Sequence, residues 1–334
     1  MSQKDRFSHQ AVAGASQAVT GDSRPTVGPI ALLPAASSNG RFVDAVESAG
    51  GTVGELDDAT RGIIWLANDD PDGLVDALHD HPQIQWVQLP WAGVDAFSEA
   101  LASNARDDLL WTSAKGAYAQ PVAEHALALA LACLRMLPER ARASSWGAKK
   151  GESLYGAKVT IVGAGGIAVE LIRLLAPFGA QVTVVRRSSG DVDGAVRTLT
   201  SDGLDAVLPE TDVLILAAAS TGETRHLIDA RRLALVKPTA VLVNIARGPL
   251  IDTDALLEAL RAEQLLGAGL DVTDPEPLPD GHGLWSEPRE VITPHSADTP
   301  DMIAPLLAER VRANVEAFVR TGRFVGIVDP TAGY

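Results

Sequence analysis

The stretch KVTIVGAGGIA, residues 158–168, runs from an apolar strand directly into a glycine-rich turn. The first glycine permits a tight turn, the second lets a pyrophosphate approach the backbone, and the small Ala168 lets the following helix pack against the strand. Free N–H groups and the dipole at the helix start favour anionic phosphates. The pattern alone also suits an ordinary connector, but its strand–turn–helix–strand context favours a dinucleotide site. The residues predicted to bind the phosphates are Gly163, Gly165, Gly166 and Ile167.

The following strand ends with an unexpected charge, in the stretch VTVVRRSSG, residues 182–190. A dinucleotide site usually carries an acidic residue about 20 positions after the turn, where it binds the adenosine ribose hydroxyls. Counting on from Ala168 puts Arg186 at that place, and Arg187 and Ser188 add further donors. A carboxylate would repel a 2′-phosphate, whereas a guanidinium pairs with phosphate in a two-pronged contact. The pattern predicts NADP, with NAD as the alternative cofactor; the competing interpretation is two solvated surface arginines.

The composition limits the classes of partner. The chain has 334 residues, enough for about two domains, and a formal net charge of −15. Binding to a nucleic-acid backbone needs clustered Lys and Arg, so we expect no nucleic-acid partner. No apolar run reaches the length of a membrane span, so we expect no membrane partner. The single cysteine, Cys133, excludes an intrachain disulfide framework and fits a reducing compartment, which predicts a cytoplasmic protein in which Cys133 is a small buried residue.

Strands alternate with helices on both sides of the glycine turn, which predicts parallel sheets covered on both faces. Residues 1–27 lack a long apolar stretch and are expected to form a disordered leader. A small α/β substrate domain is predicted over residues 28–118, and the last helix returns residues 298–334 to it. A long helix beginning near Pro121 leads into a dinucleotide-binding domain over residues 119–297. The predicted fold class is α/β, with two domains built on doubly wound parallel sheets.

Three segments that follow apolar strands carry side chains suited to chemistry: VLVNIARGPLID with Arg247, GAGLDVTDPEPLP with Asp271 and Glu276, and VITPHSAD with His295. Doubly wound sheets bind ligands at the carboxyl ends of their strands, where these segments lie. A guanidinium can bind a carboxylate and polarise a carbonyl, and a histidine can protonate its oxygen. A carboxylate beside the histidine favours the protonated imidazole. The set fits hydride transfer to a 2-oxo acid, although each residue alone also suits a helix cap or an ordinary loop.

These segments are similar to the long signature of the D-isomer-specific 2-hydroxyacid dehydrogenases, through ETRHLIDARRLALVKPTAVLVNIARGPLID and on to LWSEPREVITPHSA. The resemblance extends from about residue 115 to residue 297 and is looser before that. It implies a Rossmann cofactor domain, a smaller flavodoxin-like substrate domain and a homodimer formed through the cofactor domain. It implies that Arg247 binds substrate and is catalytic, that Glu276 partners the histidine, and that His295 is the acid/base and contacts substrate. The cofactor contacts that it implies are Asp271, at the nicotinamide amide, and Ala219, Thr224, Ile245, Ala246 and Ala297.

The resemblance also implies a substrate-binding loop at LPWAGVD, residues 89–95. Ala92 and Gly93 match the positions whose backbone N–H groups meet the substrate carboxylate. Glycine suits such a place, because a ligand must come near the backbone. Trp91 is expected either to form a wall of the substrate pocket or to be a core residue.

Departures from the family pattern sharpen the prediction. SAKGAYAQ stands where TPGVN is usual, which leaves Tyr118 near the site without an assigned role, and PHSAD replaces PHIAG. Ile245 and the arginines at the strand end resemble the glyoxylate/hydroxypyruvate reductase branch, whereas Glu276 argues against formate dehydrogenase, which pairs its histidine with glutamine. The sequence therefore predicts an NADPH-dependent reductase of a small 2-oxo acid that uses no metal. The alternatives are a cofactor-sensing, corepressor-like binding protein and a dehydrogenase of a bulkier 2-oxo acid.

Overall fold

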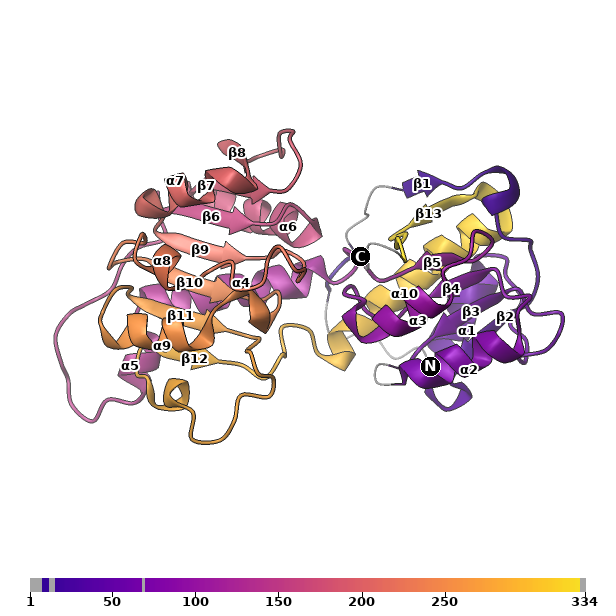
Figure 1. The fold of residues 1–334 in the computed structure, drawn as a ribbon, viewed down its shortest axis with the longest axis horizontal. Helices are drawn as coiled ribbons and strands as arrows, with labels where there is room; N and C mark the ends of the chain where they lie inside the picture. Colours follow the sequence, from indigo (N-terminus) through magenta and orange to yellow (C-terminus); the bar gives the residue numbers. More distant parts are fainter. Residues whose placement is uncertain (1–7, 12–15, 68–69, 331–334) are drawn as a thin grey trace. The chain divides into compact units, whose positions relative to one another are not determined.

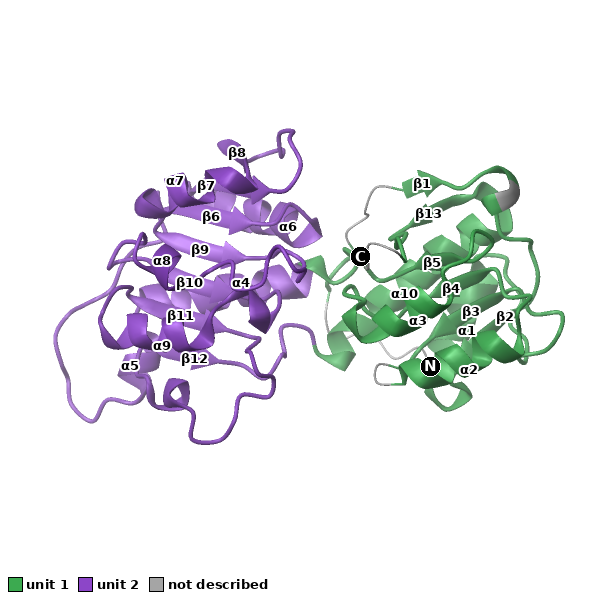
Figure 2. Ribbon diagram, in the orientation of Figure 1, with its two compact units in different colours: residues 1–119, 299–334 green, residues 120–298 purple. Residues whose placement is uncertain are grey.

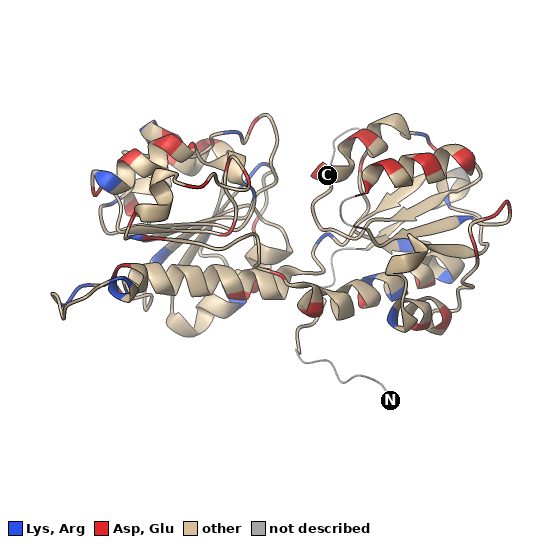
Figure 3. Ribbon diagram, turned by 90° about the horizontal axis from the view of Figure 1, so that it is seen from below, with Lys and Arg blue, Asp and Glu red and all other residues tan. Residues whose placement is uncertain are grey.

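The computed structural model divides the chain into two compact units (Figures 1 and 2). Unit 1 comprises residues 1–119 and 299–334, and unit 2 comprises residues 120–298. Both are α/β units built on a parallel sheet, which confirms the predicted fold class. Acidic and basic residues are distributed over both units (Figure 3), and no helix in the described part of the chain is long and apolar enough to cross a membrane. The residues that the structure describes are 8–11, 16–67 and 70–330.

Unit 1 is built around a four-stranded parallel sheet of short, buried strands. In spatial order they are β2 (Ile30–Leu33), β3 (Gly62–Trp65), β4 (Trp86–Gln88) and β5 (Leu110–Thr112). The ring of Trp86 is fully buried and stacks on Phe318, with centroids 5.1 Å apart, which attaches the C-terminal segment to this sheet. The main helices are α1 (Gly40–Ser48), α2 (Pro71–Asp80), α3 (Ser98–Ser103) and α10 (Pro300–Glu316), of which α10 packs against α1.

The prediction of a disordered leader over residues 1–27 is wrong for the segment from residue 16 onward. There β1 (Ser16–Ala18) pairs antiparallel with β13 (Arg323–Val325), and Nη2 of Arg24 donates to the carbonyl of Arg320 at 2.8 Å. No apolar pattern marks this strand, because backbone hydrogen bonds to a neighbouring strand hold it rather than buried side chains. Of the earlier residues of that prediction, 1–7 and 12–15 lie outside the described residues.

Unit 2 contains a seven-stranded parallel sheet whose strand order reverses between β6 and β9. The chain leaves β6 towards one edge of the sheet and later returns to β9 and continues towards the other. Such a switch point is where open α/β sheets bind ligands. In spatial order the strands are β12 (Glu290–Ile292), β11 (Gly267–Leu270), β10 (Val241–Asn244), β9 (Val213–Leu216), β6 (Lys158–Val162), β7 (Gln181–Arg186) and β8 (Arg197–Thr200).

Helices cover this sheet closely. A Cβ atom on Gly269 of β11 would lie 2.8 Å from the Cβ of Leu129, so glycine at this position lets the long helix α4 approach the strand. Residues of α7, α8 and α9, such as Val207, Leu233 and Leu256, form one buried cluster with the inner strands. The helices are α4 (Ala119–Leu134), α5 (Leu137–Ala141), α6 (Gly166–Leu175), α7 (Leu204–Val207), α8 (Ala230–Leu233) and α9 (Thr253–Arg261).

Two buried ionisable groups interact in unit 2. Cys133 of α4 is 2% exposed, as expected from the sequence; burial, and then the charge of Glu290, raises the pKa of its thiol to about 12. Glu290 is 1% exposed, and neither carboxyl oxygen has a hydrogen-bond partner among the described residues. Burial, with a contribution from Glu287, raises the pKa of Glu290 to about 9 against the opposing effect of Arg142. Both groups are therefore neutral at neutral pH.

We expect Glu290→Gln to stabilise the protein increasingly as the pH rises. The unfolded carboxyl titrates near its ordinary value of 4.5, whereas its pKa in the folded chain is about 9. The folded state thus keeps a proton that the unfolded state has lost, so stability is full below the lower value and falls as the pH rises towards the higher one. The neutral amide removes this loss, which is at most about 1.4 kcal/mol for each pH unit.

Thermal unfolding between about pH 5 and pH 9 measures this effect. The free-energy difference between Glu290→Gln and wild type should widen with pH and then level off. The matched control is Glu316→Gln, at a surface carboxylate that pairs with Arg320 at 2.7 Å, and it should follow wild type. Parallel curves for wild type and Glu290→Gln across the whole range would contradict the prediction.

Candidate active site

The glycine turn lies at the switch point of the unit 2 sheet. Gly163 has φ +114°, a conformation that side chains rarely tolerate, and a Cβ atom there would come 2.4 Å from the carbonyl oxygen of Ala217. Its N–H donates to the carbonyl of Val185 at 2.8 Å. The turn is therefore fixed between the ends of β7 and β9, and the fold itself requires glycine at position 163.

Gly165 is not required by the packing of the protein. As the N-cap of α6 it has φ −82° and ψ −170°, which any residue can adopt, and a Cβ atom would meet nothing within 4 Å. The missing side chain instead leaves the backbone open to a ligand. The first turn of α6 holds no acidic residue, and its first N–H groups have no partner within the helix. These features fit the pyrophosphate of NAD(P), with Gly165, Gly166 and Ile167 as the residues that would hold it.

Arg186 is the last residue of β7 and lies next to the glycine turn, because the adjacent Val185 accepts the hydrogen bond from Gly163. Its side chain is half-buried, and its carbonyl accepts a long hydrogen bond of 3.5 Å from Oγ of Ser201. Arg187 and Ser188 follow as exposed residues. A guanidinium thus stands at the strand end where an acid usually binds the ribose, and its contact with a 2′-phosphate stays a prediction.

His295 and Glu276 form a close pair at the carboxyl edge of the same sheet. His295 follows β12 with φ +49°, and its Nδ1 lies 2.7 Å from Oε1 of Glu276. The two side chains are 48% and 42% exposed, so the pair faces solvent rather than the core. Because the carboxylate occupies Nδ1, Nε2 is the ring nitrogen that can exchange a proton with a ligand. Oγ1 of Thr273 donates to the carbonyl of Pro275 at 2.8 Å and steadies the loop that carries Glu276.

Arg247 follows β10 in a turn that Asn244 holds at both sides. Nδ2 of Asn244 donates to the carbonyl of Arg247 at 2.9 Å, and its Oδ1 accepts from the N–H of Ala246 at 3.1 Å. A Cβ atom on the next residue, Gly248, would lie 1.8 Å from the carbonyl oxygen of Thr273. Only glycine therefore lets this turn pass so close to the loop that carries the glutamate. The loops of the arginine, the glutamate and the histidine follow three neighbouring strands at one edge of the sheet.

Asp271 fixes the loop of His295. Its carboxylate, which is 2% exposed, accepts from the N–H groups of Ser296 and Ala297 at 2.9 and 3.0 Å and from Oγ1 of Thr293 at 2.5 Å. Its carbonyl accepts from the N–H of His295 at 2.8 Å. Burial alone would raise the pKa of Asp271, but the hydrogen bonds to the carboxylate together hold it below its ordinary value. Asp271 is therefore an ionised clamp on this loop, and its predicted contact with the nicotinamide amide stays a prediction.

His125 belongs to this clamp and is not among the site residues predicted from the sequence. Its Nε2 lies 2.9 Å from Oγ1 of Thr293 and 3.4 Å from Oδ1 of Asp271, and its side chain is largely buried. The partners are 168 and 146 positions away in the chain, so no local spacing relates them. The only signal in the sequence is a histidine at the start of the apolar run HALALALACL.

Asp298, the aspartate of the PHSAD segment, is an additional acidic group in the site. Burial raises its pKa, the charges of His295 and Arg247 lower it, and the charge of Asp271 raises it. This carboxyl therefore interacts electrostatically with His295 and Arg247, two of the residues predicted to bind substrate. The departure from the usual PHIAG was the signal for it in the sequence.

The remaining predicted cofactor residues also follow strands of this sheet. Ala219 and Thr224 lie in the loop after β9, where Oγ1 of Thr224 donates to the carbonyl of Ala219 at 2.9 Å. Ile245, Ala246 and Ala297 are buried next to Arg247 and His295 in the sequence. Their contacts with a cofactor stay predictions.

The loop predicted to bind the substrate carboxylate belongs to unit 1 and follows β4. Trp91 is half-buried and packs against the core of this unit, with its ring edge-on to that of Tyr118 at a centroid distance of 6.3 Å. It is thus partly a core residue and partly accessible, and its place at the wall of a substrate pocket stays a prediction. Ala92 and Gly93 are also half-exposed.

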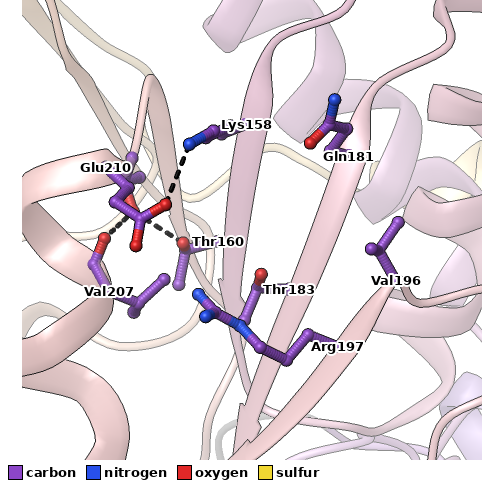
Figure 4. Close-up of a pocket in the computed structure, with 9 residues that line it drawn as sticks. Lys158, Thr160, Gln181, Thr183, Val196, Arg197, Val207 and Glu210 are labelled. Atoms are coloured by element: carbon purple, nitrogen blue, oxygen red, sulfur yellow. Dashed lines mark hydrogen bonds and ion pairs between the residues drawn. The ribbon is translucent and has the colours of Figure 1, made fainter.

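A cavity of about 280 Å³ lies elsewhere in unit 2, at the amino ends of β6, β7 and β8 (Figure 4). Lys158 and Glu210 pair with each other at its rim, with Nζ and Oε2 2.8 Å apart, and Thr160 and Thr183 belong to its lining. Parallel sheets bind ligands at the opposite, carboxyl ends of the strands, so this cavity is not the candidate active site. In the described ranges no group of three or more His, Cys, Asp and Glu could hold a metal ion.

Comparison with known proteins agrees with this geometry. The family model described as D-isomer specific 2-hydroxyacid dehydrogenase, NAD binding domain, matches residues 127–297. An uncharacterized protein of Corynebacterium melassecola is 40% identical over 269 residues, 78% of this chain and 88% of that protein. A glyoxylate reductase of Pyrococcus furiosus is 36% identical over 221 residues, which cover 63% of this chain and 64% of the reductase.

The fold has close solved counterparts as well. The structure of a D-isomer specific 2-hydroxyacid dehydrogenase from Xanthobacter autotrophicus Py2, in complex with NADPH and MES, superposes with a TM-score of 0.77 at 26% identity. The match covers 92% of this chain and all of that one. The resemblance inferred from the sequence is therefore confirmed: the chain belongs to the D-isomer-specific 2-hydroxyacid dehydrogenases, oxidoreductases that act on the CH–OH group of their donors.

Proposed function

We propose that this enzyme is an NADPH-dependent reductase of a small 2-oxo acid such as glyoxylate or hydroxypyruvate. The observation that carries the proposal is the pair of His295 and Glu276, 2.7 Å apart, in loops beside that of Arg247. In this proposal unit 2 binds the dinucleotide and unit 1 carries the loop for the substrate carboxylate. The Pyrococcus furiosus relative, a glyoxylate reductase, supports the choice of a small substrate.

Each residue has a defined task in this mechanism. NADPH, when bound, supplies the hydride that is added to the carbonyl carbon of the substrate. The guanidinium of Arg247 binds the substrate carboxylate and polarises the carbonyl. Nε2 of His295 donates a proton to the carbonyl oxygen, and Glu276 at Nδ1 stabilises the protonated ring before that transfer. In the reverse direction the same nitrogen accepts the proton of the hydroxyl group.

The cofactor choice rests on Arg186. Its place beside the glycine turn, at the end of β7, suits a guanidinium that pairs with the 2′-phosphate of NADPH. Arg187 and Ser188 add donors that an exposed phosphate can use. The Xanthobacter autotrophicus structure, which was determined with NADPH, supports this choice.

We further propose that the enzyme is a cytoplasmic homodimer that associates through unit 2. Trp146 and Leu137 follow α4 and are 92% and 56% exposed, which is unusual for large apolar side chains and suits an interface.

Light scattering should therefore give a mass near twice the 35.0 kDa of one chain. Replacing Trp146 and Leu137 together by Ser should shift the protein towards the monomer, and a wild-type protein that is monomeric at all concentrations would refute the dimer.

Replacing His295 by Gln should lower kcat/KM for glyoxylate by about 10²- to 10⁴-fold, because the proton donor is lost. The rate is followed by the disappearance of NADPH, and thermal unfolding verifies the fold. His79→Gln, at an exposed histidine of α2, is the matched control and should keep the wild-type rate. Full reductase activity of His295→Gln would contradict the proposed mechanism.

Replacing Arg186 by Asp together with Arg187 by Ala should weaken the use of NADPH by roughly 10- to 100-fold relative to NADH, the worth of a lost charge-assisted contact. The measurement is kcat/KM for each cofactor at a fixed 2-oxo acid concentration. Arg197→Ala is the control and should change neither value, because Arg197 lies at the amino end of β8, whereas Arg186 lies at the carboxyl end of the neighbouring β7. Equal losses with both cofactors would show that Arg186 and Arg187 are surface residues that do not bind the 2′-phosphate.

A further inference from the structure

Three hydrogen bonds attach one side of the loop at residues 89–93 to the segment at residues 112–118 of the same unit. The N–H of Leu89 donates to the carbonyl of Thr112 at 2.7 Å, and the N–H of Ala114 donates to the carbonyl of Trp91 at 2.9 Å. The hydroxyl of Tyr118 donates to the carbonyl of Pro90 at 2.5 Å. The carbonyls of two consecutive loop residues therefore both face this segment.

The fixed carbonyls decide where the N–H groups of the loop point. In a trans peptide the carbonyl of one residue and the N–H of the next face opposite ways, and the peptide bonds after residues 90 and 91 are trans. The bond from Tyr118 to Pro90 thus turns the N–H of Trp91 away from the segment, and the bond from Ala114 to Trp91 does the same for Ala92. Among the described residues, none accepts a hydrogen bond from the N–H groups of Trp91, Ala92 and Gly93.

Tyr118 is itself held firmly. Its side chain is 2% exposed, and its ring meets that of Trp91 edge to face, at an interplanar angle of 87°. The segment before it is fixed by the buried Arg310 of α10, whose Nη1 donates to the carbonyls of Ser113 and Lys115 at 2.8 and 2.9 Å. The hydroxyl of Tyr118 therefore contacts the loop from a buried ring, in a segment that Arg310 holds in place.

We propose that Tyr118 is the positioning residue of the substrate loop: it orients the backbone N–H of Trp91, next to that of Ala92, towards the carboxylate of a 2-oxo acid and holds the ring of Trp91 beside these donors. The inference rests on the proposed function, because it assigns to those donors the anion that such a reductase binds. A carboxylate has two acceptor oxygens, and donors that are oriented in advance bind it at a lower entropic cost than a mobile loop would. Tyr118 acts through the loop and does not take part in the chemical step.

Tyr118→Phe tests this, since it keeps the ring and removes only the hydroxyl. The carbonyl of Pro90 then loses its partner, and we expect KM for glyoxylate to rise about tenfold, the worth of one such hydrogen bond. The inhibition constant of oxamate, an analogue of a 2-oxo acid that is not reduced, should rise in parallel. KM for NADPH should stay at the wild-type value, and kcat should change much less than KM. Amide hydrogen exchange should accelerate in the peptide that contains residues 89–95.

Tyr155→Phe is the matched control, because its ring packs on Phe178 in unit 2 at a centroid distance of 5.1 Å and is 73% exposed. It should leave every constant unchanged. If Tyr118→Phe lowers only the melting temperature and leaves KM and the oxamate constant unchanged, the hydroxyl has a purely structural role and the inference is overturned. Failure of the variant to fold would overturn it too, because the hydroxyl would then serve unit 1 as a whole. If wild type reduces no 2-oxo acid, the proposed function fails instead.

Discussion

The buried carboxylate of Asp271 is the constraint on which the arrangement of the candidate active site depends. It lies at the end of β11 and accepts hydrogen bonds from two N–H groups and one hydroxyl of the loop after β12. A charge in such a place is tolerated only because its oxygens are satisfied, so the hydrogen bonds and the ionised state support each other. Removing one donor would leave a buried charge poorly compensated. The conformation of the loop therefore depends on all of these hydrogen bonds together. The unusual backbone of His295, with φ +49°, persists because this loop over-determines it.

The parts of the fold and of the site that the sequence predicts are those encoded by short spacing. The glycine turn at 163–168, the alternation of apolar strands with helices, and the polar segments after three strands are local patterns, and each strand end of a parallel sheet faces the same edge. This is why the segments that carry Arg247, Glu276 and His295 are predicted to lie at one edge, whereas the choice of Glu276 over Asp271 as the partner of the histidine comes from the family resemblance. The counting that put Arg186 at the end of the second strand depends on the same local rule, since one helix separates the two strands.

What the sequence does not reveal depends on contacts between distant segments. The strand at Ser16–Ala18 has no apolar pattern and exists through its pairing with β13, more than 300 positions away. His125 reaches Asp271 from a helix whose periodicity indicates only an apolar face. The hydroxyl of Tyr118 has a defined partner, the carbonyl of Pro90, 28 positions earlier, which depends on how two short strands of the unit 1 sheet lie in register. Such partners follow from packing and not from spacing.

In each unit a buried polar side chain holds the loop that is predicted to belong to the active site. In unit 2 the Asp271 carboxylate gathers backbone N–H groups, and in unit 1 the Tyr118 hydroxyl fixes a backbone carbonyl. The Asp271 carboxylate accepts hydrogen bonds, whereas the Tyr118 hydroxyl donates one, and each suits the group that its loop presents. An acceptor that binds the N–H groups of the histidine loop leaves the ring of His295 exposed, as its proposed role as proton donor requires. A donor that holds a carbonyl turns the N–H of the next residue the opposite way, which is the orientation proposed for binding the substrate carboxylate. Neither set of hydrogen bonds involves the ligand, so both loops are ordered before a ligand binds. The free energy of substrate binding is then not reduced by the entropic cost of ordering the loops.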